Sequence, residues 1–169
     1  MPKLAYSATR QVPLKPVYWV GSSLDDLREC PEEVQDVVGY ALFLAQGGGQ
    51  HPAAKRQHEG RAMKITKSNG NVFADLRLPD AEERLLKAQL AAEIARIIAH
   101  RKLTQRAAAE LVGADQPKVS HLLHGRLAGF STDRLLAWLT ALGQDVEIFV
   151  RTPPRRRQGQ LRVRILAAR

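Results

Sequence analysis

The stretch LTQRAAAELVGADQPKVSHLLHG, residues 103–125, decides the fold of this chain. It predicts two short helices joined by a tight turn. Thr104 suits the start of the first helix, because its hydroxyl can accept a hydrogen bond from a free amide of the first turn. Gly113 tolerates the positive φ that the turn requires. Asp115 can cap the second helix, and Pro117 suits its first turn, where the N–H that proline lacks would have no partner.

The spacing of small, apolar and polar residues in this stretch follows a known pattern. The matching positions are Leu103, Thr104, Gln105, Ala109, Gly113, Gln116, Val119, Ser120, Leu123 and Gly125. With these residues the chain resembles the helix-turn-helix proteins of the Cro/repressor type (XRE). The resemblance implies a lambda-repressor-like bundle, whose second helix lies in the major groove with its N-terminal end at the base edges. It also implies that Gln105 braces a phosphate and the side chain of Gln116.

The outward side of the second helix is polar and basic. Gln116 can read adenine through two hydrogen bonds, and Lys118 can donate to guanine. Residues such as Ser120 and Arg126 suit phosphates, which set register rather than sequence. The residues expected to contact DNA are Gln105, Gln116, Pro117, Lys118, Ser120, His121, His124 and Arg126. On an isolated helix a polar face is more simply solvated, but in this motif, on a basic chain, DNA contact is the favoured interpretation.

Charge points to the same class of partner. The formal net charge is +9 for 169 residues, and the excess lies toward the C-terminal end, where residues 152–169 hold several arginines and no acidic residue. Such an excess favours a polyanion, with nucleic acid ahead of an anionic membrane. A signal peptide and an apolar run long enough to span a membrane are both absent from the sequence. We expect a cytoplasmic protein with no membrane partner.

The sequence contains little that suggests chemistry. Cys30 is the single cysteine, so no internal disulfide can form, which fits a reducing compartment. An activating base for Cys30 is not evident nearby, and a structural role is the simpler interpretation. His121 and His124 have the spacing of a metal-binding pair, but a Cys or acidic residue that would complete the site is missing. We expect no metal, no cofactor and no enzymatic activity.

The N-terminal part predicts a strand and a helical hairpin after a disordered segment, residues 1–14. Residues 15–20, KPVYWV, are strand-like. One helix is predicted from Ser22 or Ser23, and a longer one from Pro31, which ends at a run of glycines. The longer helix has an apolar stripe, formed by Val34, Val37, Val38, Ala41, Leu42 and Ala45.

Residues 15–54, from PVYWVGSSLDDLREC through the second helix, resemble the start of RelE/HigB-type toxins, which are ribosome-dependent mRNA interferases. In those toxins antiparallel strands follow and carry the catalytic residues. Here the next residues are KRQHEGRAMKITKSNG, so the resemblance stops before the active site and transfers no catalytic residue. A helical hairpin of other use is the alternative, and its stripe must find another partner, self-associate or stay loosely folded.

Residues 55–71 have the composition of a linker. From Met63 to about Arg151 the chain resembles HigA-like antitoxins. Either the gene joins the front of a toxin to a complete antitoxin, or Met63 is an ordinary residue of a natural fusion. The short apolar element at residues 72–76 is expected to be either a toxin-binding surface or an arm packed on its own domain.

The remaining elements complete a domain at residues 72–151. A helix over residues 81–101 has an aliphatic face, and another over residues 132–142 contains Trp138, expected in the core or a dimer interface. Residues 145–151, DVEIFVR, alternate as a strand does. The economical partner for a lone strand is the same strand of a second copy, which predicts a homodimer. The basic tail, residues 152–169, is either an edge strand or a disordered segment that adds DNA affinity.

The sequence thus predicts a mainly α protein: a helix-turn-helix bundle with a C-terminal β-strand, preceded by a small segment of one strand and a helical hairpin. The leading functional interpretation is a sequence-specific regulator that binds double-stranded DNA, an antitoxin-like autorepressor of a toxin–antitoxin operon. Two alternatives remain. One is a protein that mainly neutralises a RelE/HigB-type toxin, and the other is a residual mRNA-interferase toxin.

Overall fold

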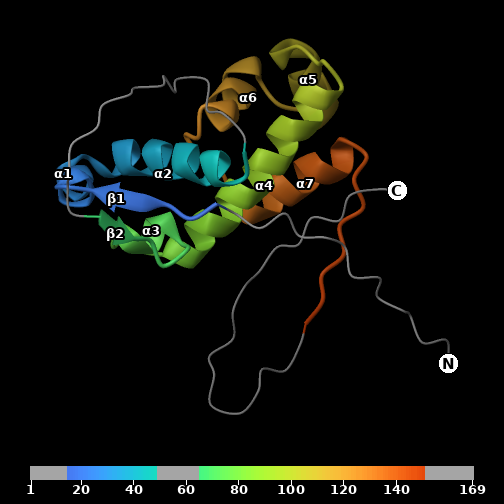
Figure 1. Ribbon diagram of the computed structural model, residues 1–169. Helices are drawn as coiled ribbons and strands as arrows, with labels where there is room; N and C mark the ends of the chain where they lie inside the picture. The colour runs from blue at the N-terminus through green and yellow to red at the C-terminus, as the bar shows by residue number, and fades with distance from the viewer. Residues whose placement is uncertain (1–14, 49–64, 151–169) are drawn as a thin grey trace, which may run out of the picture.

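The computed structural model describes residues 15–48 and 65–150. These ranges contain seven helices and two short strands (Figure 1): β1 (Tyr18–Val20), α1 (Ser23–Glu29), α2 (Glu32–Gln46), β2 (Ile65–Lys67), α3 (Val72–Asp75), α4 (Ala81–His100), α5 (Gln105–Val112), α6 (Gln116–Leu123) and α7 (Thr132–Ala141). The predicted mainly helical fold is confirmed. In the part described, none of the helices has the length and apolar character needed to cross a bilayer. The expectations for residues 1–14, Met63 and the tail 152–169 lie outside the described residues.

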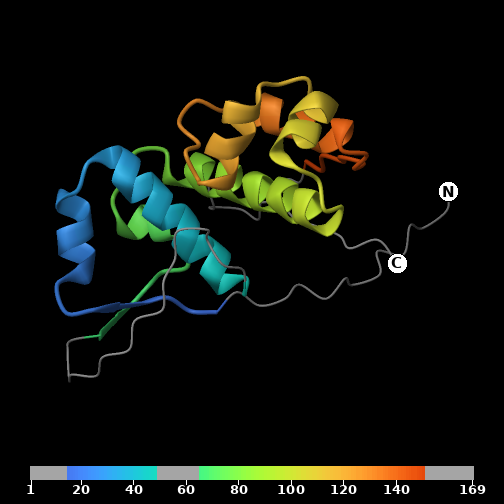
Figure 2. The ribbon, with the colours of Figure 1, turned by 90° about the horizontal axis from the view of Figure 1, so that it is seen from above.

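Helix α4 is the axis of the structure. It runs between the α1–α2 hairpin and the group formed by α5, α6 and α7 (Figure 2). Its apolar residues recur every three to four positions, so they line one side of the helix. All the predicted ones are buried: Leu86, Leu90, Ile94, Ile97 and Ile98. Trp138 of α7 is also in the core, where its ring packs edge-on against Phe130 at 5.4 Å between centroids.

The two strands pair across the chain, against one expectation. β1 and β2 are antiparallel, with Trp19 opposite Thr66. The sequence assigned residues 65–67 to a linker, because they follow a polar segment and are too few to show a period. Pairing with a distant strand, which local composition does not report, orders them instead. Trp19 faces inward and its Nε1 donates to Asp75 Oδ2 at 3.0 Å.

Helix α2 buries a face that differs from the predicted stripe. Val34 and Ala45 of that stripe are exposed, and the others are half-buried. The buried positions are Gln35, Gly39, Tyr40 and Gln46. The reason is the shape of the neighbouring surface: Gly39 gives room to the ring of Phe73, to which a Cβ atom at Gly39 would come within 2.6 Å. The helix therefore packs by close approach at a glycine, and Leu42 and Leu44 add partly buried contacts with the core.

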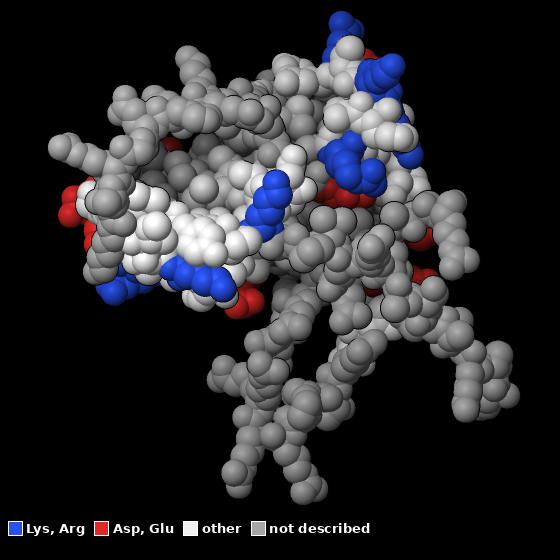
Figure 3. All heavy atoms as spheres, viewed as in Figure 1, with Lys and Arg blue, Asp and Glu red and all other residues white. Residues whose placement is uncertain are grey.

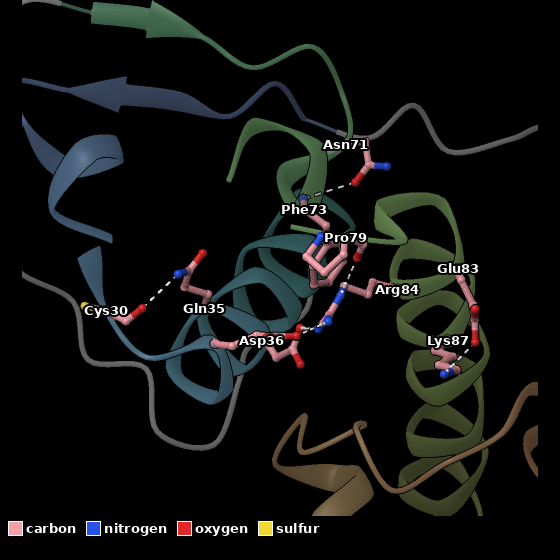
Figure 4. Close-up of polar contacts among 10 residues, drawn as sticks. Cys30, Gln35, Asp36, Asn71, Phe73, Pro79, Glu83, Arg84 and Lys87 are labelled. Atoms are coloured by element: carbon pink, nitrogen blue, oxygen red, sulfur yellow. Dashed lines mark hydrogen bonds and ion pairs between the residues drawn. The ribbon is translucent and has the colours of Figure 1, made fainter. Parts of the chain in front are cut away.

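Polar contacts also join the N-terminal hairpin to the rest of the chain (Figure 4). The guanidinium of Arg84 on α4 donates to the carboxylates of Asp36 and Glu32 on α2 and to the carbonyl of Pro79. Desolvation lowers the pKa of Arg84, but the hydrogen bonds to the two carboxylates outweigh it and raise that pKa. Arg28 of α1 donates to the carbonyl of Asp75 at 2.7 and 3.1 Å.

Helix α3 packs on its own chain. Val72 and Phe73 are buried, and the element contacts both α2 and α4. Asn71 caps it, since its Oδ1 accepts from the amides of Phe73 and Ala74. Of the two alternatives for this segment, a surface for a toxin or an arm on its own domain, the second describes the structure.

The predicted C-terminal strand is absent from the part of the chain that is described. Residues 145–150 belong to neither a helix nor a strand. Ile148 and Val150 are 77% and 94% exposed, so these apolar side chains lie mostly in solvent. A strand needs a partner for its backbone groups, and among residues 15–48 and 65–150 this segment has no strand beside it.

Replacing Gly39 tests the packing of α2. In a solvated helix Gly→Ala stabilises by about 1 kcal/mol. We expect Gly39→Ala instead to lower the free energy of unfolding by about 1–3 kcal/mol, because the buried Phe73 ring must move. Urea unfolding measures the change. Val34→Ala, at an exposed position of the same helix, is the control and should change stability by less than about 0.5 kcal/mol. A stabilised Gly39→Ala variant would show that Phe73 does not lie against Gly39.

Candidate nucleic-acid interface

The two helices of the candidate interface begin and end as their residues predict. The hydroxyl of Thr104 accepts from the amide of Ala107 at 3.2 Å, which caps α5. Gly113 ends α5 with φ +64°, and its amide donates to the carbonyl of Ala109. Asp115 stands at the N-cap of α6, but its side chain makes no capping hydrogen bond and lies 4.0 Å from Lys118 Nζ. Turn geometry thus sets the angle between α5 and α6.

One side of α6 is buried and the other is open to solvent. Val119 and Leu122 are fully buried, against α4 and α5. Ala108 and Ala109 of α5 are buried too, and their small size allows the two helices to approach closely. The opposite side of α6 is therefore presented outward on a rigid support.

Gln105 and Gln116 form the link between the two helices. Gln116 Nε2 donates to Gln105 Oε1 at 2.5 Å. Gln105 is half-buried and opens α5, whereas Gln116 is exposed and opens α6. This contact, which the family resemblance implied, fixes the side chain at the N-terminal end of α6.

The predicted contact residues fall into two groups. Those with exposed side chains are Gln116, Pro117, Lys118, His121 and Arg126. The remaining three, Gln105, Ser120 and His124, are half-buried. The ring of His124 turns back on its own helix, with Nδ1 2.7 Å from the carbonyl of Ser120. Because a carbonyl only accepts, Nδ1 carries the proton and is not available to a phosphate. His124 therefore uses Nδ1 at the end of its own helix, and a DNA contact through Nε2 stays a prediction.

Charge is distributed unevenly over the surface. Lys and Arg side chains are most numerous at the end of the molecule that holds α5, where Asp and Glu side chains lie among them, and another acidic group lies at the opposite end, beside α1 (Figure 3). The first turn of α1 contains Asp25 and Asp26, and that of α2 contains Glu32 and Glu33. The carboxylates in the first turns of α1 and α2 repel a polyanion from that part of the hairpin. Among residues 15–48 and 65–150, no group of three or more His, Cys, Asp and Glu side chains could hold a metal ion.

Sequence reasoning missed a contact at the far end of α6. Tyr40 of α2 lies against Gly125, two residues after the end of the helix. Gly125 has a positive φ, +72°, which glycine commonly adopts after a helix, but its neighbour was not expected. A contact between residues so far apart in the chain leaves no local pattern. The one available signal was the glycine–tyrosine pair at residues 39–40, in a helix whose other apolar residues are mostly aliphatic.

Comparisons with known proteins cover the C-terminal half. The family model described as "Helix-turn-helix domain" matches residues 72–151. A solved chain titled "Putative XRE Family Transcriptional Regulator" is 48% identical in sequence. The match spans 100% of that chain and 53% of this one, with a TM-score of 0.47. No curated protein matches. The similarity rests on sequence identity over the full length of the solved chain.

The two N-caps provide a matched pair of substitutions. Thr104→Ala should lower the free energy of unfolding by about 1 kcal/mol, because the amide of Ala107 loses its partner. Asp115→Ala should cost less than half of that, since the Asp115 side chain caps no amide. Thermal unfolding of both variants measures the difference. Equal losses would mean that the Thr104 bond does not stabilise α5.

Proposed function

The chain belongs to the XRE family of helix-turn-helix proteins, as its sequence predicts, and from this membership we propose that it is a sequence-specific DNA-binding transcriptional regulator. The observation that carries the proposal is the exposed side of α6, with Gln116 held by Gln105 at its N-terminal end. A glutamine fixed in this way has both groups of its amide directed by the protein, which suits bidentate recognition of adenine.

The proposed mechanism is steric and involves no bond chemistry. Helix α6 enters the major groove, where Gln116 and Lys118 face base edges. Arg126, exposed just after the helix, is positioned to bind a phosphate. Occupying an operator in this way excludes other proteins from it. Because its proposed partner is DNA, we place the protein in the cytoplasm.

We propose that the regulator acts as a homodimer. Residues 146–150 expose apolar side chains, with Ile148 and Val150 mostly in solvent. The same segment of a second copy can cover them and supply the missing strand partner, in a two-fold arrangement. Two recognition helices related by a two-fold axis match a palindromic site, whose half-sites lie about one helical turn apart. Dimerisation would therefore both cover the exposed apolar segment and present two recognition helices to a palindromic site.

We further propose an antitoxin-like role, in which the protein represses its own toxin–antitoxin operon. The support is the resemblance of the C-terminal domain to HigA-like antitoxins and of residues 15–54 to the start of RelE/HigB-type toxins. A toxin of that type is then the second partner. The exposed acidic side chains of α1 and α2 repel RNA phosphates, which argues against residual mRNA cleavage by this segment.

Two substitutions in α6 test DNA recognition. The probe is a duplex enriched from a random-sequence pool by the unaltered full chain. Gln116→Ala and Lys118→Ala should each weaken binding to this duplex by about 1–3 kcal/mol, because contacts to base edges are lost. Both substitutions should also reduce the difference in affinity between the enriched duplex and an unrelated duplex. Titration by fluorescence anisotropy at fixed salt gives both affinities.

The control for charge is Lys67→Ala. Lys67 is exposed on β2, away from α6, and its loss removes the same charge as Lys118→Ala. It should leave the preference for the enriched duplex unchanged. Unaltered preference in both α6 variants would contradict the proposed recognition face.

The homodimer is tested at the exposed apolar segment. Ile148→Asp should shift the chain from dimer to monomer, because a charge would have to be desolvated in the interface. Sedimentation velocity over a concentration series measures the shift. Glu147→Gln, at the neighbouring exposed position, should leave the dimer intact. A chain that is monomeric without substitution would contradict the proposal.

A further inference from the structure

The C-terminal end of α6 is packed against a residue from the N-terminal hairpin. Gly125, which is buried two residues after the end of the helix, has φ +72°, which glycine adopts readily. A Cβ atom there would lie 2.4 Å from Cδ1 of Tyr40 and 2.9 Å from its Cβ. Tyr40 is fully buried, and burial raises its pKa. Its side chain therefore lies directly on the backbone of the turn that follows α6.

Helix α2 cannot withdraw Tyr40 without breaking other contacts. The residue before it, Gly39, lies against the buried ring of Phe73 on α3. One turn earlier, the carboxylate of Asp36 is bound by Arg84 of α4 (Figure 4). These contacts attach the middle and the start of α2 to the core of the DNA-binding domain. Tyr40 is consequently a fixed support and not a mobile side chain.

The position of Tyr40 determines what it can constrain. Val119 and Leu122 hold the middle of α6 against α4 and α5, which fixes the depth of the helix. A contact beyond the last turn, at Gly125, fixes its tilt. Tilt matters for reading bases, because a shift of about 1 Å at a binding group is enough to lose a well-aligned hydrogen bond.

The hairpin itself is not suited to touch DNA. Its exposed charged residues are mainly acidic, and Arg28 is occupied by Asp25 and by the carbonyl of Asp75. Its effect on DNA binding must therefore pass through the protein. The Tyr40–Gly125 contact is the place where it meets the recognition helix.

From this geometry we infer that Tyr40 is a positioning residue for DNA recognition: by its contact with Gly125 it sets the tilt of α6, and thus where Gln116 and Lys118 meet the bases. This inference rests on the proposed DNA-binding function. It makes the N-terminal hairpin a working part of the regulator, and it assigns a specificity-determining residue to a segment outside the family domain.

The test compares Tyr40→Leu, Tyr40→Ala and Tyr40→Phe in the full chain. Leucine keeps apolar volume in the core while it removes the ring from Gly125. Alanine removes both, and phenylalanine keeps the ring. Binding is measured to the duplex enriched by the unaltered chain and to an unrelated duplex. The temperature is one at which circular dichroism shows the variants folded. Val34→Ala, exposed on the same helix, is the control.

We expect Tyr40→Leu to weaken binding to the enriched duplex by roughly tenfold, within the range by which residues outside a site affect it. Binding to the unrelated duplex should stay the same, because phosphate contacts tolerate a changed tilt. Tyr40→Phe and Val34→Ala should resemble the unaltered chain. Equal loss on both duplexes, or no loss on either, would overturn the inference. If the unaltered chain enriches no sequence, the proposed function fails and the inference with it.

A second variant tests the contact from the other side. Gly125→Ala places a methyl group against Tyr40 and should also reduce the preference for the enriched duplex. In the double variant Gly125→Ala/Tyr40→Leu, part of this preference should return, because the collision is relieved while the strain at positive φ remains. Such non-additivity marks residues in contact. Simple addition of the two losses would overturn the coupling.

Discussion

Two rings that pack on two glycines join the halves of this chain. Phe73 of the DNA-binding domain lies against Gly39 of the hairpin, and Tyr40 of the hairpin lies against Gly125 of the DNA-binding domain. Each glycine lacks a side chain at the point where the partner residue has a large ring. The backbones can therefore approach closely, and the rings are fully enclosed. One ring belongs to the DNA-binding domain and the other to the hairpin. The hairpin therefore cannot slide or turn without breaking one of the two contacts. The attachment is mainly steric, and the ion pairs of Arg84 with Glu32 and Asp36 also orient α2 against α4.

Helix α4 connects the hairpin to the recognition helices, because it contacts both. Its N-terminal half meets α2 and α3, and the same helix contacts α6 and α7. The apolar side of α4 thus serves one continuous core, which extends from Trp19 and Tyr40 to Leu135 and Leu142. The family model begins at residue 72, but the hydrophobic core does not. Residues before position 72 contribute to the core that holds α6 in place.

Local patterns predicted the helices well and their partners poorly. Helices α4 to α7 follow from apolar spacing and turn glycines, with side-chain caps at α5 and α7, and all of these depend on residues within a few positions of one another. The bond between Gln105 and Gln116 followed from the family pattern. In contrast, β2 is ordered by pairing with β1, and α2 is oriented by Phe73 and Gly125. Such contacts between distant residues depend on which surfaces the whole chain brings together, which a hydrophobic stripe in one helix does not specify.

The separation of charge gives the hairpin a role that its surface alone would not suggest. The acidic side chains in the first turns of α1 and α2 repel phosphates, so this part of the hairpin is unfavourable for contact with DNA. A segment that avoids DNA can still affect how DNA is read, provided that it touches the recognition helix where no base contact is made. The end of α6 after Leu123 meets this condition, since Gln116 and Lys118 lie at the other end. The residue that adjusts the reading helix and the residues that read can therefore vary independently, which is how a regulator can gain a new segment without losing its site.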